Sequence, residues 1–227
     1  MTEHRPTHRL DRLDRLDTVY PPTASIPSTL WACGPAPHEP GDLWPTSVVR
    51  RAITEFSHPA AQVMLLATTS THQTAASRAR AGLADLQRSI QTLTAMDSPT
   101  APTRGEADLI IASLLPDRPG PHSADAPTRL VFAAADRLRD GAVLTVLTQC
   151  SHHPTGTLHD PTGPVVAAAQ AADLLYLAHI VATPIHDQTI VAPPTSGEHA
   201  TTQHQIAHID VSVFIRPTSC AVAVAAA

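Results

Sequence analysis

Short aliphatic runs alternate with segments of helical spacing along most of the chain. A strand that is covered on both faces reads as a nearly continuous apolar run. Five such runs span residues 63–67, 107–113, 141–148, 174–182 and 206–215. Apolar residues three and four positions apart predict helices over residues 47–56, 71–86, 126–139 and 163–173. The alternation predicts an α/β fold with a doubly wound, mostly parallel sheet covered by helices on both faces.

The last aliphatic run differs from the others because polar residues interrupt it at every second position. Ile209, Val211 and Val213 are apolar, and Asp210 and Ser212 stand between them. A period of two is typical of a strand with one face on the core and the other in water. We therefore expect Asp210 and Ser212 to point outward.

The two ends of the chain lack this alternation. Residues 9–17 repeat Arg-Leu-Asp three times, which predicts a short amphipathic helix. We expect this helix to pack on the domain or on a partner, as in a homo-oligomer, because its aspartates cancel the field with which its arginines would attract nucleic acid. A proline-rich stretch up to Pro45 predicts an extended lead-in. The chain is thus divided into an N-terminal helix and lead-in (1–43), an α/β domain (44–217) and an alanine-rich tail (218–227).

Composition narrows the choice of partners and compartment. The net charge of −5 and the isoelectric point near 6.2 argue against a broad basic surface for duplex DNA, while a local arginine stripe stays open. Lysine is absent and alanine, threonine and proline are abundant, which indicates a GC-rich bacterial genome.

The cysteines and the apolar runs bear on location and on metal binding. Cys33, Cys150 and Cys220 are odd in number and widely spaced, so a reduced, cytoplasmic setting is expected. No apolar run approaches the roughly 18 residues that span a bilayer, so we expect no membrane association. Residues 150–160 carry cysteine, histidine and aspartate at spacings that match no familiar zinc pattern, and no metal site is predicted there.

Three segments, in this order, resemble motifs of the class I S-adenosylmethionine-dependent methyltransferases, and among them the DNA N4-cytosine and N6-adenine amino-methyltransferases. Pro45, Ile53 and the strand start Val63-Met64 match the first segment of that family. Asp108-Leu-Ile-Ile-Ala-Ser113, followed by Leu-Leu-Pro116, is similar to its Asp-Leu-x-x-x-Ser-Pro-Pro-Tyr signature. Val213-Phe-Ile-Arg-Pro217 is similar to its Val-Phe-Arg-Lys-Pro pattern. Over residues 44–217 the resemblance implies a Rossmann-like methyltransferase fold with an antiparallel last strand, S-adenosylmethionine as cofactor and DNA as partner.

The resemblance also locates candidate site residues. Thr68, Thr69 and Ser70 follow the first strand of the family pattern, where the family has an acid and glycines that approach the cofactor, so we expect a hydroxyl-lined cofactor turn here. The alternative is an ordinary turn in which one hydroxyl caps the next helix. Asp85 is the candidate for the acid that holds the cofactor ribose, against the alternative of a helix-surface position.

Ser113 and Pro116 are the candidate catalytic residues. In the family this turn orients the exocyclic amine and stacks an aromatic ring on the flipped base. Here Ser113 is kept, leucines replace the two prolines and Pro116 replaces the aromatic ring. The alternative for Ser113 is a residue that simply closes a strand.

Two functions stay open. One is methyl transfer from S-adenosylmethionine to a DNA base amine, in which orienting the amine would suffice because the sulfonium already activates the methyl group. The other is a catalytically degenerate methyltransferase-fold protein that serves as a binding or assembly module.

Overall fold

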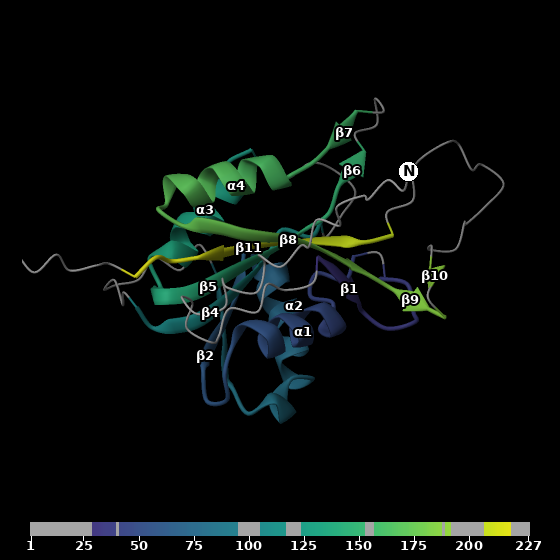
Figure 1. Ribbon diagram of the computed structural model, residues 1–227, viewed down its shortest axis with the longest axis horizontal. Coiled ribbons are helices and arrows are strands. Elements are labelled where there is room, and N and C mark those ends of the chain that lie inside the picture. Colours follow the sequence, from purple (N-terminus) through teal and green to yellow (C-terminus); the bar gives the residue numbers. More distant parts are fainter. Residues whose placement is uncertain are drawn as a thin grey trace, which may run out of the picture.

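A seven-stranded sheet forms the centre of the protein (Figure 1). The computed structural model describes residues 29–39, 41–94, 105–116, 124–152, 157–187, 189–191 and 207–218. The strand order is β1-β8-β11-β5-β4-β2-β3. The strands are β1 (Leu30–Ala32), β2 (Gln62–Ala67), β3 (Ser89–Thr94), β4 (Ala107–Ser113), β5 (Leu138–Thr148), β8 (Leu175–Thr183) and β11 (Ile209–Ile215). Two short hairpins, β6 (Ser151–His152) with β7 (Leu158–His159) and β9 (Ile185–His186) with β10 (Thr189–Ile190), lie outside this sheet.

The sheet is parallel except at β11. This strand inserts between β5 and β8 and runs antiparallel to both. The other pairs, from β1 with β8 to β2 with β3, are parallel. The structure therefore confirms the doubly wound, mostly parallel sheet and the antiparallel last strand.

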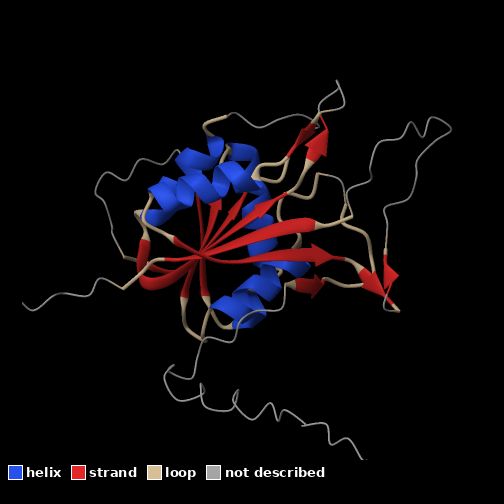
Figure 2. Ribbon diagram, turned by 45° about the horizontal axis from the view of Figure 1, so that its top comes forward, coloured by secondary structure: helices blue, strands red, loops and turns tan. Residues whose placement is uncertain are grey.

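Helices cover both faces of the sheet (Figure 2). The helix α1 (Thr46–Phe56) and the helix α2 (Ser70–Ala81), followed by the short 3-10 turn η1 (Ala84–Leu86), pack on one face. The helices α3 (Ala126–Ala135) and α4 (Thr162–Ala171) pack on the other. Each face has its own apolar core, which explains why β2 and β4 are largely aliphatic.

Two strands arise where the sequence predicted none. The strand β3 contains Gln91 and two threonines and lies at the sheet edge with alternating exposure, so it has no continuous apolar run. The strand β1 is only three residues long and lies inside the predicted lead-in, so the sheet begins before residue 44. The N-terminal helix predicted over residues 9–17 and the alanine-rich tail from 219 onward lie outside the described residues.

The prediction that Asp210 and Ser212 point outward is wrong. Both are buried, with relative exposures of 5% and 0%. They lie on the same face of β11 as Phe214, which belongs to the core under α3 and α4. Because β11 is an inner strand with both faces covered, its alternation separates two buried faces rather than a core from a surface.

Candidate functional site

The order of the strands reverses beside β2, which pairs with β3 on one side and with β4 on the other. In open α/β sheets, ligands bind in the crevice at the carboxyl ends of the strands at such a switch point. In this sheet the switch point, which we call the crevice, lies between the turn from β2 to α2 and the end of β4. The predicted residues Thr68–Ser70 and Ser113 come together at this edge of the sheet.

The turn after β2 presents hydroxyls and caps the following helix. Thr69 accepts a hydrogen bond from the backbone N–H of His72 at 3.2 Å, so it acts as the N-cap of α2. Thr69 and Ser70 are exposed and Thr68 is half-buried. The capping alternative is thus confirmed for Thr69.

A segment just before α1 fills the crevice from the other side. The hydroxyl of Ser113 donates to the carbonyl oxygen of Leu43 at 2.7 Å and accepts from the N–H of Leu115 at 3.3 Å. The indole N–H of Trp44 donates to the carbonyl oxygen of His72 at 3.0 Å. Leu43 and Trp44 are 5% and 2% exposed. This segment therefore ties the end of β4 to the first turn of α2.

Ser113 is fully buried, and its hydroxyl holds the Leu43 segment. The residue two positions on, Leu115, is also buried, and Pro116 is half-buried at the end of the described stretch. A part for Ser113 and Pro116 in a reaction stays a prediction. In this structure the contacts of Ser113 are with the backbone of the protein.

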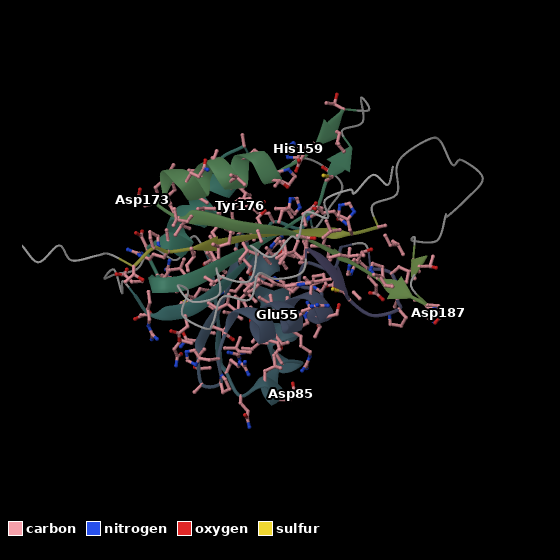
Figure 3. All side chains as sticks on the ribbon, viewed as in Figure 1. Glu55, Asp85, His159, Asp173, Tyr176 and Asp187 are labelled. Atoms are coloured by element: carbon pink, nitrogen blue, oxygen red, sulfur yellow. The ribbon has the colours of Figure 1, made fainter. Side chains whose placement is uncertain are left out.

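The structure does not bring Asp85 to the crevice. Asp85 lies on η1, before β3 begins, and therefore at the amino edge of the sheet, whereas Thr68–Ser70 lie at the carboxyl edge. Figure 3 shows it beneath α1 and α2, far from His159. Its carboxylate accepts two hydrogen bonds from Arg50, at 2.6 and 2.9 Å, and the guanidinium lowers the pKa of Asp85. These contacts agree with the helix-surface alternative.

Sequence reasoning missed a polar cluster farther along the same carboxyl edge. The buried carboxylate of Asp210 on β11 lies 2.8 Å from Nε2 of His179 on β8 and 3.5 Å from Nε2 of His208. The first distance is a hydrogen bond and the second is that of an ion pair. The imidazoles of His179 and His208 are 39% and 40% exposed, while the carboxylate side chain of Asp210 is 7% exposed. The one available signal was an aspartate inside an otherwise aliphatic strand.

Electrostatics couple these groups. Burial acts to raise the pKa of Asp210, but the hydrogen bonds and charges of His208 and His179 outweigh it and leave that pKa lowered. The interaction with the Asp210 carboxylate raises the pKa of His208 against the effect of its partial burial. Asp210 is therefore ionised at neutral pH and favours a proton on His208.

Two hydroxyls lie beside this carboxylate on the same face of the sheet. Thr148 on β5 is directly opposite Asp210, and Ser212 is directly opposite His179. Both are fully buried, and neither hydroxyl has a hydrogen-bond partner among the described residues. We call Thr148, His179, His208, Asp210 and Ser212 the His–Asp cluster.

The cysteine and histidine stretch after β5 does not assemble a metal site in the described part of the chain, where no group of three donors is placed to hold an ion. Burial, followed by the charges of Asp160 and Asp210, raises the pKa of the Cys150 thiol. Cys150 is thus a neutral thiol rather than a nucleophile at neutral pH.

A cavity of about 410 Å³ lies at the opposite, amino edge of the sheet. It opens between the C-terminal ends of α3 and α4 and is lined by Asp136, Asp140, Asp173 and Arg216. Arg216 donates to the carbonyl oxygens of Ala135 and Leu138, and its Nε lies 3.3 Å from Asp140. The arginine of the Phe-Ile-Arg-Pro segment therefore ties the end of β11 to the end of α3.

No protein-family model matches the chain, and no curated protein matches its sequence. Several solved structures are similar to it in backbone. A TehB-like S-adenosylmethionine-dependent methyltransferase from Corynebacterium glutamicum is 10% identical, with a TM-score of 0.40 over 74% of this chain and 86% of that one. An S-adenosylmethionine-dependent methyltransferase from Methanosarcina mazei is 9% identical, with a TM-score of 0.43 over 73% and 97%.

A third similar structure was solved with ligands. The 1,6-didemethyltoxoflavin-N1-methyltransferase from Burkholderia thailandensis, with bound 1,6-didemethyltoxoflavin and S-adenosylhomocysteine, is 10% identical, with a TM-score of 0.44 over 79% of this chain and 80% of that one. These likenesses concern the course of the backbone. The Rossmann-like sheet assigned here rests on the order and directions of its own strands.

Among the described residues, no helix is both long enough and apolar enough to cross a membrane.

Proposed function

We propose that the protein binds S-adenosylmethionine in the crevice between the β2–α2 turn and the end of β4, and that it transfers the methyl group to an exocyclic amine of a DNA base. The observation that carries the donor site is the reversal of strand order beside β2, with a turn of three hydroxyl residues at its carboxyl end. The acceptor rests on the sequence resemblance around Ser113.

The chain offers a partial set of contacts for this cofactor. Thr68 and Ser70, together with the free N–H groups of the first turn of α2, would hold its polar groups. When bound, the cofactor supplies a methyl group activated by its sulfonium. Ser113 would act by holding the segment of Leu43 and Trp44 in place beside the cofactor.

A specific observation favours a second function, that of a catalytically degenerate binding or assembly module. Leu43 and Trp44 are buried in the crevice, and the turn after β2 has neither a glycine nor an acid. In this alternative the segment is a permanent part of the core and no donor enters. The helix predicted over residues 9–17 would then contact the partner, which includes a second copy of the chain.

Isothermal titration separates the two functions. We expect micromolar binding of S-adenosylmethionine and S-adenosylhomocysteine to the full chain. Thr68→Val keeps the shape but removes the hydroxyl, and we expect it to weaken binding about tenfold, as for one lost hydrogen bond to a charged group. Asp85→Asn is the matched control and leaves the affinity unchanged, because Asp85 lies at the other edge of the sheet.

Absence of heat at millimolar ligand would contradict the donor site and support the module. Transfer of a labelled methyl group from the donor to DNA then tests the acceptor. Binding without transfer to DNA would support the cofactor site and contradict the proposal that a DNA base amine is the acceptor.

A further inference from the structure

The His–Asp cluster gathers five polar side chains from three neighbouring strands and the residue preceding one of them. Thr148 is on β5, His179 on β8, and Asp210 and Ser212 on β11, with His208 just before β11. Their register places them together on the face covered by α3 and α4, near the carboxyl ends of the strands. No other place in the described part of the sheet brings a carboxylate and two imidazoles together.

The hydroxyls of Thr148 and Ser212 show that the protein does not satisfy every polar group of the cluster. Each is fully buried beside the carboxylate, and neither bonds to any described residue. A buried hydroxyl without a partner destabilises the fold by about 1–3 kcal/mol. Such groups in a native structure commonly bond to water or to a bound polar molecule. The half-exposed imidazoles leave the cluster open to solvent.

The cluster lies within reach of the donor crevice. Ser113 pairs with Leu147 on β5, and Leu147 pairs with Val211 on β11. Asp210 is therefore two strands away from the end of β4, along the same edge, which corresponds to about 10 Å at the usual spacing of strands. The side chain of Ser113 faces α1 and α2, whereas the side chains of Thr148 and Asp210 face α3 and α4. An acceptor that meets the donor would therefore lie over the carboxyl end of β5, between the two faces.

Asp210 fixes the proton on one nitrogen of His179. An ionised carboxylate only accepts hydrogen bonds, so Nε2 of His179, at 2.8 Å, carries the proton. In the neutral ring Nδ1 then has a free lone pair, and no described residue bonds to it. An imidazole with one nitrogen held by a carboxylate and the other open is the usual arrangement of a general base.

We propose that the His–Asp cluster is the subsite for the methyl acceptor, that this acceptor is a protic N–H or O–H group, and that His179 takes up its proton. The inference rests on the proposed function for its donor. As the acceptor atom bonds to the methyl carbon, the carbon–sulfur bond breaks and its electron pair stays on sulfur. The proton of the acceptor atom moves to Nδ1 of His179 and from there to solvent. Asp210 positions the imidazole, and the half-exposed rings of His179 and His208 meet the acceptor.

Several other ionisable groups face the cluster. His208 contacts Asp210 directly, and its charge is felt by His38, which also interacts with Asp42. Cys150 lies within electrostatic range of Asp160 and Asp210. The titration of these groups contributes to any pH dependence measured at this site, so rates of variants are compared at one pH.

Ring opening of 5-nitrobenzisoxazole tests the base without a methyl donor. In this reaction a base removes the carbon-bound proton of the probe, the nitrogen–oxygen bond breaks, and a coloured cyanophenolate forms. We expect the full chain to accelerate it over buffer and His179→Gln to lower the rate about tenfold or more. The matched control is His186→Gln, since His186 is 62% exposed and pairs with Asp187 away from the sheet, and it leaves the rate unchanged.

Asp210 needs a readout that a purely structural part would not change. Nitrogen NMR of the imidazoles reports which nitrogen carries the proton, and we expect Asp210→Asn to shift His179 from the Nε2–H toward the Nδ1–H form with a parallel loss of rate. Asp210→Glu, which keeps the charge, restores part of both. A rate in His179→Gln equal to that of the unaltered chain, or an unchanged tautomer in Asp210→Asn, overturns the inference.

Failure here and failure of the proposed function are distinguishable. The ring-opening assay contains no S-adenosylmethionine, so it tests the general base alone. The isothermal titration tests the donor site alone. Methyl transfer to DNA or to a catechol then tells the N–H acceptor from the O–H acceptor. Zinc binding by the chain with loss of ring opening would also overturn the inference, because it would make the histidines ligands rather than bases.

Discussion

Two stretches of the carboxyl edge of one sheet differ in how their polar groups are satisfied. Beside β2 and β4, the hydroxyls of Ser113 and Thr69 and the indole of Trp44 all have partners within the protein. Beside β5, β11 and β8, two hydroxyls lack partners and two imidazoles stay half-exposed around a buried carboxylate. The first stretch contains the residues that resemble methyltransferase motifs, and the second contains the polar groups without hydrogen-bond partners.

Hydrogen-bond satisfaction separates structural from functional polar residues at such an edge. A polar residue whose donors and acceptors are all used by the backbone stabilises the fold. One that is buried and left without a partner destabilises the fold, and it points to a site where exposed ionisable groups lie beside it, as at Asp210 but not at Thr145. By this criterion the polar groups of the crevice beside β4 are already satisfied by the protein itself, and a donor would have to bind beside the Leu43 segment.

The largest effect should come from Trp44→Ala. The change removes a ring that is 2% exposed, along with its bond to the carbonyl of His72, so we expect a loss of about 3–5 kcal/mol in the free energy of unfolding. Urea unfolding measures it, and Leu177→Ala, at a side chain that is 52% exposed, is the control with a small effect. A loss below 1 kcal/mol would mean that Trp44 is a movable cover rather than core.

Ser113→Ala should have an intermediate effect. It leaves the buried carbonyl oxygen of Leu43 without its donor, and we expect a loss of about 1–3 kcal/mol. Ser89→Ala, at an exposed position on β3, is the matched control and should change little. If Ser113→Ala were neutral in stability and still abolished methyl transfer, the satisfied stretch would be the catalytic one and the comparison would fail.

The smallest effect should be the pH dependence of the His–Asp cluster. The pKa of His208 is raised from its ordinary 6.5, so its contribution is fully present below that pH and is lost as the pH rises through the raised value. The pKa of Asp210 is lowered from its ordinary 3.8, so its contribution is present above that pH and is lost on acidification. The stability difference between the unaltered chain and Asp210→Asn should therefore be largest between about pH 4 and 6.5.

Urea unfolding at a series of pH values measures this difference. Asp187→Asn serves as the control, because the His186–Asp187 pair is exposed and should give a nearly flat profile. A flat profile for Asp210→Asn as well would show that the carboxylate and the imidazoles do not interact in solution.

The sequence was informative where burial is continuous. The strands β2, β4 and β5 could be predicted because each is covered on both faces and is therefore an aliphatic run. The strand β3 could not, since an edge strand with exposed positions has a mixed composition. Asp210 was misplaced for a related reason, since alternation does not tell a solvent-facing side from a second buried side.

The candidate site was predictable only in part. Thr68–Ser70 follow directly from the end of β2, so a local motif sufficed to place them at the crevice. The position of Asp85 depends on the edge of the sheet at which its turn lies. Because β3 was not predicted from the sequence, that edge could not be assigned. The contact of His179 with Asp210 joins two strands 31 residues apart in sequence, and no local spacing carries such information.

The central place of β11 has a consequence for how the chain reaches this fold. The strand that joins β5 to β8 is the seventh in chain order, so the sheet stays in two halves with open inner edges until residues 209–215 have left the ribosome. Contacts between segments so distant in sequence form slowly, and unpaired edges invite association between chains. Nascent copies should therefore depend on chaperones, and truncation before residue 209 should yield insoluble protein rather than a smaller domain.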